Sequence, residues 1–199
     1  MQVIEFNPKK YSLAEIDYLA ACFQKGQVLA YPTDTIYGLG ALANRQTAIK
    51  KISKIKGRAE GKSFLFLVSS LTMMAKYGQL SRRQKQWIKE QKKPTTVILA
   101  GQGNLLREIT AADGSVALRL ISEPFLAKLI SRLGVPLISS SVNLSGERPL
   151  IKSDEIIDFF LGQSPKLRPD LIIAAPAVGK KPSRLVDLRD VDNIKILRK

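Results

Sequence analysis

The chain has 199 residues, of which 45% are hydrophobic and 25% charged, a balance typical of a globular protein of one domain. It has no histidine and one cysteine, Cys22, which excludes an imidazole base, a histidine-bound zinc and an internal disulfide. Lys and Arg outnumber Asp and Glu by 32 to 17, and the net charge of +15 indicates either a basic, soluble surface or a polyanionic partner. The apolar runs are too short to span a bilayer and the N-terminus lacks a secretory pattern, so we expect a cytoplasmic protein with no membrane partner.

Helical and extended patterns alternate from the N-terminus onward. The capping box at 12–15, Ser-Leu-Ala-Glu, predicts a helix that ends at Gly26, and the apolar run 28–31 predicts a strand. Asn44 is the expected cap of a second helix, which Gly57 ends. In chain order there follow a strand over 64–68, helices over 72–77 and 82–91, and strands over 95–100 and 115–120.

The second half of the chain continues the alternation. Ser122 is the expected cap of a helix with Pro124 in its first turn and Gly134 at its end. A short strand over 137–139 follows, and Ser153 is the expected cap of a helix through residue 160. Strands over 171–174, 184–188 and 194–197 complete the pattern, which predicts an α/β fold with one continuous sheet in a single domain over residues 1–199.

Three polar segments lie where predicted elements end. Segment 31–40, YPTDTIYGLG, follows a strand and fits either a ligand site at the carboxyl end of that strand or a structural turn. Segment 54–62 places Lys and Arg at a helix C-terminus, where they fit either a phosphate clamp or complementation of the helix dipole. Segment 139–146 brings four serines and an asparagine after a strand, as a phosphate cradle or as a loop that caps its own backbone.

Together and in this order, these segments resemble the YrdC/Sua5 family, the threonylcarbamoyl-AMP synthases. The resembling residues are YPTDTIYGLG at 31–40, KGR at 56–58, VALRL at 116–120 and VPLISSSVNLSGERP at 135–149, with weaker likeness at 94–99, 182–188 and 196–198. The resemblance covers the chain from about Gly26 onward. It implies a YrdC-like (DHBP synthase-like) fold, in which a twisted, mixed parallel/antiparallel sheet flanked by helices surrounds a basic central cavity.

The activity that the resemblance implies is ATP-dependent synthesis of L-threonylcarbamoyl-AMP from L-threonine and bicarbonate, with release of pyrophosphate. Partner proteins would then transfer the threonylcarbamoyl group to adenosine 37 of transfer RNA. Mg²⁺ is expected to bridge the ATP phosphates, and no residue is assigned as a metal ligand. The mechanism needs no nucleophile from the protein, which suits a chain without histidine.

The family motifs also imply roles for individual residues. The K-x-R and S-x-N motifs give four catalytic residues, which would contact ATP phosphates and a carbamate: Lys56, Arg58, Ser141 and Asn143. The remaining matches give residues that would bind substrate or nucleotide: Thr33, Thr35, Tyr37, Lys62, Arg119, Ser139, Ser183 and Arg198.

Two other functions remain open from the sequence. One is a non-enzymatic protein of double-stranded RNA binding or ribosome maturation, for which RNA is a direct partner, and the other is a related carbamoyl-adenylating enzyme. The sequence departs from the family pattern at Ala59, Ser63, Phe64 and Arg184, which is expected to change the threonine pocket more than ATP binding. The chain is also expected to represent the single-domain form, without the C-terminal domain of the longer Sua5 form.

Overall fold

The structure is a computed structural model that describes residues 1–57, 63–176 and 181–199. The strands are β1 (Gln2–Glu5), β2 (Leu29–Tyr31), β3 (Gly38–Leu42), β4 (Leu65–Val68), β5 (Thr95–Ala100), β6 (Ser115–Leu120), β7 (Leu137–Ser141), β8 (Leu171–Ala174), β9 (Arg184–Asp187) and β10 (Lys195–Arg198). The helices are α1 (Leu13–Gln24), α2 (Gln46–Ile55), α3 (Leu71–Tyr77), α4 (Arg82–Lys89), α5 (Pro124–Leu133) and α6 (Ser153–Leu161), with short 3-10 turns η1 (Arg107–Ile109) and η2 (Pro165–Leu167).

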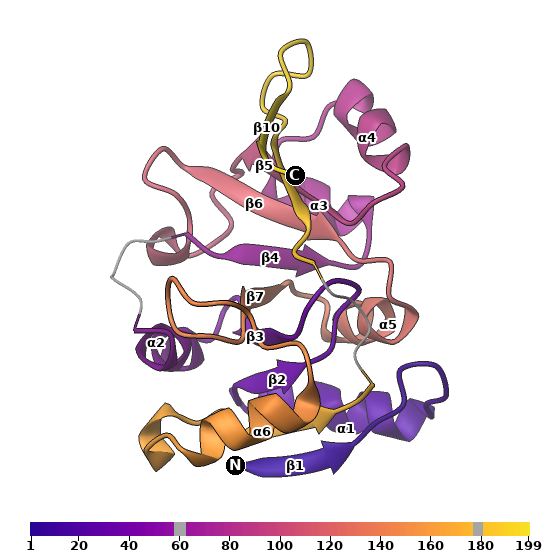
Figure 1. Cartoon of the computed structure of the whole chain (residues 1–199). Helices are drawn as coiled ribbons and strands as arrows, with labels where there is room; N and C mark the ends of the chain where they lie inside the picture. The colour runs from indigo at the N-terminus through magenta and orange to yellow at the C-terminus, as the bar shows by residue number, and fades with distance from the viewer. Residues whose placement is uncertain (58–62, 177–180) are drawn as a thin grey trace.

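All the strands of the described residues join one sheet, in the order β1-β8-β2-β3-β7-β4-β6-β5-β9-β10 (Figure 1). β8 pairs in parallel with both β1 and β2, and β4 with β6 and β5 with β9 are also parallel pairs. The other pairs are antiparallel. The predicted α/β fold with a mixed sheet flanked by helices is therefore confirmed.

Helix α1 follows the predicted pattern closely. Ser12 caps it with a full capping box, and Gly26 takes the left-handed conformation after its end, at φ 79°. α1 packs against α5 and against β3, while α5 also packs against β4. The buried faces of these helices join one continuous apolar core with the central strands.

Three predicted helix caps are wrong by one residue. α2 is preceded by Arg45 rather than capped by Asn44, and no side chain bonds its first turn. Glu123 and Lys152 occupy the cap positions of α5 and α6, again without a side-chain cap. Ser122 lies one residue before the cap, and its hydroxyl donates to Asp34 Oδ2, 3.2 Å away, in a segment distant in sequence. A local pattern does not reveal such a distant partner.

Two strands were not predicted. β1 is short and lies at the edge of the sheet, and β3 includes Gly38 and Gly40, residues that weaken a strand signal. β7 also runs two residues beyond the predicted strand, to Ser141. Residues 38–40 of the first segment and 139–141 of the third are therefore paired strands rather than loops. Among the described residues, no helix is long and apolar enough to cross a bilayer.

Candidate functional site

A cavity of about 490 Å³ lies on the sheet itself. Its floor is a row of residues at paired positions on four neighbouring strands: Ser139 on β7, Leu65 on β4, Ala117 on β6 and Ile98 on β5. Two of these side chains, those of Ser139 and Ala117, are small, which leaves space above the strands. The fold thus places a hollow at the centre of the sheet.

The two ends of this cavity carry different polar groups. On antiparallel strands, Arg119 lies two residues beyond the floor row in one direction and Ser141 two residues beyond it in the other. Four residues of strand correspond to about 13 Å, so the two groups lie at opposite ends. We call the end with Thr96, Arg119, Ser183 and Arg198 the arginine end, and the end with residues 141–147 the serine-loop end.

Lys56 organises the serine-loop end from below. It is 5% exposed, and its Nζ donates to the backbone oxygens of Ser141 and Asn143, at 2.7 Å each, and to Asn143 Oδ1 at 2.5 Å. Ser141 Oγ donates to the same Asn143 oxygen, and Asn143 Nδ2 donates to the backbone oxygen of Glu147. Lys56 of the K-x-R motif therefore contacts both named residues of the S-x-N motif, and it bonds the loop whose Ser141 and Asn143 line the cavity.

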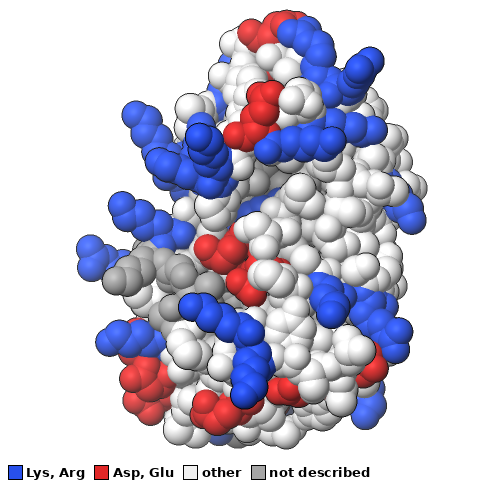
Figure 2. All heavy atoms as spheres, turned by 90° about the vertical axis from the view of Figure 1, so that its right-hand side faces the viewer, with Lys and Arg blue, Asp and Glu red and all other residues white. Residues whose placement is uncertain are grey.

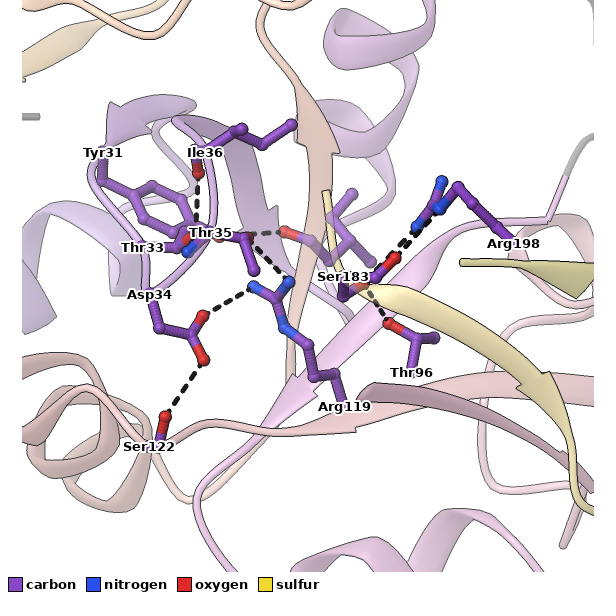
Figure 3. A network of polar contacts seen from close by, with 11 residues as sticks. Tyr31, Thr33, Asp34, Thr35, Ile36, Thr96, Arg119, Ser122, Ser183 and Arg198 are labelled. Atoms are coloured by element: carbon purple, nitrogen blue, oxygen red, sulfur yellow. Dashed lines mark hydrogen bonds and ion pairs between the residues drawn. The ribbon is translucent and has the colours of Figure 1, made fainter. Parts of the chain in front are cut away.

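Arg119 lies at the arginine end, 3% exposed. Its Nη1 donates to Thr35 Oγ1 at 2.9 Å, and its Nη2 lies 3.2 Å from Asp34 Oδ1 (Figure 3). Burial lowers the pKa of Arg119, and the nearby Asp34 carboxylate counteracts that effect. A guanidinium remains charged under these conditions, so the cavity wall holds a buried cation.

A second polar network, with Thr96 and Ser183 buried and Arg198 exposed, lies beside Arg119. Thr96 and Ser183 share a hydrogen bond of 2.8 Å between their hydroxyls, and Arg198 Nε donates to the Ser183 backbone oxygen at 2.9 Å. Thr96 is paired with Arg119 across β5 and β6, so the two arginines lie on either side of the hydroxyl pair. Strand β10 thus carries Arg198 to the same end of the cavity as β6 carries Arg119 (Figure 3).

The hydroxyl of Tyr37 does not face this cavity, although its side chain contributes to the wall. Its Oη lies 2.9 Å from the backbone oxygen of Ala175, and it accepts from the Ala175 N–H. Burial raises the pKa of this phenol, which keeps it neutral. Tyr37 therefore ties the loop after β2 to the end of β8.

The structure gathers most of the residues predicted from the motifs. Those that line the cavity are Thr33, Thr35, Tyr37, Arg119, Ser139, Ser141, Asn143, Ser183 and Arg198. Lys56 lies behind the lining, while Arg58 and Lys62 lie outside the described residues. Their roles in binding and catalysis, and the predicted basic character of the cavity, stay predictions. Among the described lining residues the charged ones are Arg119, Arg198 and Glu147.

Sequence reasoning missed two polar residues of the arginine end. Thr96 reaches it because β5 pairs with β6 and β9, and only sheet order reveals that. Asp34 lies in segment 31–40, but its ion pair with Arg119 joins residues far apart in sequence. Of the positions that depart from the family pattern, Ser63 and Phe64 line the cavity, Arg184 bonds Gln91 instead, and Ala59 lies outside the described residues.

Carboxylate ligands for a resident metal ion do not gather at this cavity. Across residues 1–57, 63–176 and 181–199, no cluster of three or more Cys, Asp or Glu side chains could hold one. Asp34 faces Arg119 and Ser122, and the lining contributes only Glu147 among the described carboxylates. The described donor set does not fit a permanent metal centre.

Comparison with known proteins identifies the family. A family model of Sua5, YciO and YrdC proteins, described as telomere recombination, matches residues 21–199. The chain belongs to this family. It is 31% identical to a threonylcarbamoyl-AMP synthase of Dichelobacter nodosus, over 81% of this chain and 84% of the relative.

Solved structures of the family have the same fold. Escherichia coli YciO superimposes with a TM-score of 0.87 at 26% identity, covering all of this chain and 95% of that one. The structure of P. abyssi Sua5 complexed with L-threonine superimposes with a TM-score of 0.83 at 24% identity, over 94% of this chain and 54% of that one.

Proposed function

We propose that this protein uses ATP to convert L-threonine and bicarbonate into L-threonylcarbamoyl-AMP, with release of pyrophosphate. The observation that carries the proposal is the contact of Lys56, of the K-x-R motif, with the S-x-N motif at one end of a cavity that has two arginines at its other end. Membership of the family and the name of the Dichelobacter nodosus relative support it. The product would supply the threonylcarbamoyl group for adenosine 37 of transfer RNA, through partner proteins.

The reaction would proceed without covalent attachment to the protein. The threonine amine and bicarbonate form a carbamate and water, and a carbamate oxygen then attacks the α-phosphorus of ATP. Pyrophosphate leaves as the new phosphorus–oxygen bond forms. Both reactants are anions, so the contribution of the protein is to hold them close together and to offset their repulsion.

The cavity offers suitable groups at both ends. Ser141 and Asn143 present a hydroxyl and an amide on a loop that Lys56 bonds from below. Arg119 and Arg198 present guanidinium groups, which bind carboxylate or phosphate oxygens in pairs. We propose that Arg58, Ser141 and Asn143 act at the reacting groups, and that Lys56 contributes to catalysis by holding the loop that carries Ser141 and Asn143. We further propose that the residues of the wall and the arginine end bind substrate.

Magnesium would enter as part of the substrate, the Mg²⁺ complex of ATP. The described carboxylates do not form a site for it, and ATP phosphates supply the oxygens that this ion prefers. Bound there, Mg²⁺ would reduce the negative charge on the triphosphate.

The test is pyrophosphate release from Mg²⁺ and ATP, measured with and without bicarbonate and L-threonine, with serine and glycine as controls. Release that requires both threonine and bicarbonate is the expected result. If ATP binds but no pyrophosphate is released with threonine, this family member uses another acceptor. A chain that does not bind ATP would contradict the proposal and favour the RNA-binding function.

A further inference from the structure

Asp34 and Arg119 form an ion pair beside the cavity, and of the two only Arg119 lines it. Their side chains are 9% and 3% exposed, and Arg119 Nη2 lies 3.2 Å from Asp34 Oδ1 (Figure 3). The two atoms are close enough for an ion pair but not aligned for a hydrogen bond, because Asp34 Oδ1 has no hydrogen-bond partner. Ser122 Oγ fixes the other carboxylate oxygen from the start of α5. The carboxylate therefore faces the guanidinium from a fixed position.

The threonines of segment 31–40 fix the guanidinium from a second side. Thr33 Oγ1 donates to the backbone oxygen of Ile36 at 2.7 Å, so the 2.9 Å contact between the two threonine hydroxyls must be a donation from Thr35 to Thr33. Thr35 Oγ1 can then only accept from Arg119. Both hydroxyls are committed to this chain of hydrogen bonds and serve to orient Arg119.

The Nε atom of Arg119 is a donor without a partner, and it is buried. A buried donor without a partner costs free energy. Arg119 lines the cavity, so its positive charge acts on an oxyanion bound there.

The charge near Arg119 is unevenly balanced. Arg198 lies close enough to lower the pKa of Arg119 further, so two cations share this end of the cavity. Asp34 is the carboxylate paired with Arg119, and Glu123, at the N-terminus of α5, has its pKa raised by its own burial and then by Asp34. Glu147 lies in the serine-loop segment at the other end. Asp34 therefore partly offsets the charge that a substrate anion would meet.

We propose that Asp34 is a positioning residue, which holds the Arg119 guanidinium in the orientation that receives a substrate oxyanion and limits how tightly that anion binds. The oxyanion is either the carboxylate of the amino acid or a phosphate of ATP, and the inference rests on the proposed function for the identity of these ligands. Asp34 touches no substrate atom in this scheme and acts through Arg119.

Two substitutions separate charge from orientation. Asp34→Asn keeps the shape and removes the charge, so the Kd for the anion bound at Arg119 should fall about tenfold, since a repelling charge nearby is lost. Asp34→Ala also removes the contact, and kcat should fall about tenfold or more because the guanidinium is no longer oriented. Asp34→Glu restores the carboxylate and should keep both values within about threefold of wild type.

The measurements are the Kd of inorganic pyrophosphate and of L-threonine by calorimetry, together with kcat and KM for pyrophosphate release. The ligand whose Kd falls in Asp34→Asn is the one held at Arg119. Asp170→Asn is the control. Asp170 Oδ1 lies 2.7 Å from Lys51 Nζ, and neither residue lines the cavity, so the loss of this carboxylate should change neither Kd.

Unchanged Kd values in Asp34→Asn would overturn the proposal, as would equal losses of binding for both ligands in step with lost stability. The binding measurements do not depend on turnover. If wild-type protein released no pyrophosphate, they would still decide the role of Asp34, while the failure would fall on the proposed function alone.

Discussion

Gly40 lies where β3 passes the ring of Tyr31. A Cβ atom at Gly40 would lie 2.4 Å from the backbone oxygen of Ile138 and 2.6 Å from Tyr31 Oη. At Gly38 the nearest atom would be Ser139 Oγ, at 2.6 Å. Close packing against backbone therefore requires glycine at position 40. At Gly38 the nearest atom belongs to a serine side chain that can rotate, and Gly38 also lines the cavity.

Gly40→Ala is expected to destabilise the fold by about 2–3 kcal/mol, because the Cβ would be forced against backbone. Gly162→Ala is the matched control: the nearest atom to its Cβ would be at 3.6 Å, and its φ of −72° suits alanine. Gly162→Ala should change the free energy of unfolding by less than about 1 kcal/mol, in the stabilising direction. Urea unfolding of both variants measures this, and equal stability would contradict the packing argument.

Tyr31 is buried, and burial raises its pKa from 10.0 to about 12. Below pH 10 the Tyr31 phenol keeps its proton in both the folded and the unfolded state, so the full contribution of Tyr31 to the free energy of unfolding is present. From about pH 10 to pH 12 the phenol ionises in the unfolded state but not in the folded state. Ionisation stabilises the unfolded state, so the free energy of unfolding falls with rising pH. At about 1.4 kcal/mol for each pKa unit, the loss attributable to Tyr31 is about 3 kcal/mol.

Tyr31→Phe removes this part of the pH dependence and should match wild type within about 1 kcal/mol at neutral pH, since its hydrogen bond to Ile138 is long, at 3.5 Å. Urea unfolding across this pH range compares the two. Parallel curves above pH 10 would show that the phenol ionises as easily in the folded state as in the unfolded one.

At the scale of elements, the loop after β7 depends on the end of α2. Lys56 donates to three oxygens of Ser141 and Asn143, and its own backbone oxygen accepts from Ser145 N–H at 3.2 Å. Helix, strand and loop are joined by one buried ammonium group. The positions of Ser141 and Asn143 in the cavity therefore depend on a residue that the lining does not include.

Lys56→Met removes these bonds and leaves buried oxygens without a donor, so stability should fall by about 1–3 kcal/mol. Pyrophosphate release should fall much further, because the loop is no longer held. Lys54→Met, on the same helix end but exposed, is the control and should stay within about 0.5 kcal/mol of wild type. Near-normal turnover in folded Lys56→Met protein would remove Lys56 from the proposed mechanism.

Most helices and interior strands could be predicted from local signals. The capping box at Ser12 and the glycines at 26 and 134 all lie at helix ends, and the strands over 95–100 and 115–120 have the predicted bounds. The predicted caps at Asn44, Ser122 and Ser153 are wrong by one residue, and the edge strand β1 and the glycine-containing β3 were not predicted. β3 forms through pairing with β2 and β7, which a local pattern does not reveal.

At the scale of the whole molecule, sheet order could not be read from the pattern of elements. Residues of β3, β7, β4, β6, β5, β9 and β10 together line the cavity, and their order in the sheet differs from their order in the chain. The motif resemblance gathered Ser141, Asn143 and Arg119 into one predicted site, whereas composition and periodicity alone would have left them apart. Strand register explains why Thr96 was missed, and Asp34 was missed because its ion-pair partner is distant in sequence.

The net charge of +15 does not by itself identify a binding surface. Figure 2 shows Lys and Arg side chains distributed over several parts of the face in view, with Asp and Glu between them. RNA as a direct partner therefore stays a prediction. The arrangement of charged side chains at one place, as at Arg119 and Asp34, says more about a ligand than the net charge of the protein does.

The place of β8 bears on how the protein is made. β8 lies between β1 and β2, so Gln2 and Leu29 both pair with Leu171. A growing polypeptide would hold its first two strands without their shared neighbour until that late segment left the ribosome. Such distant pairing slows folding and leaves apolar strands exposed meanwhile. Protection by chaperones during translation should therefore matter more for this protein than for one whose neighbouring strands follow each other in sequence.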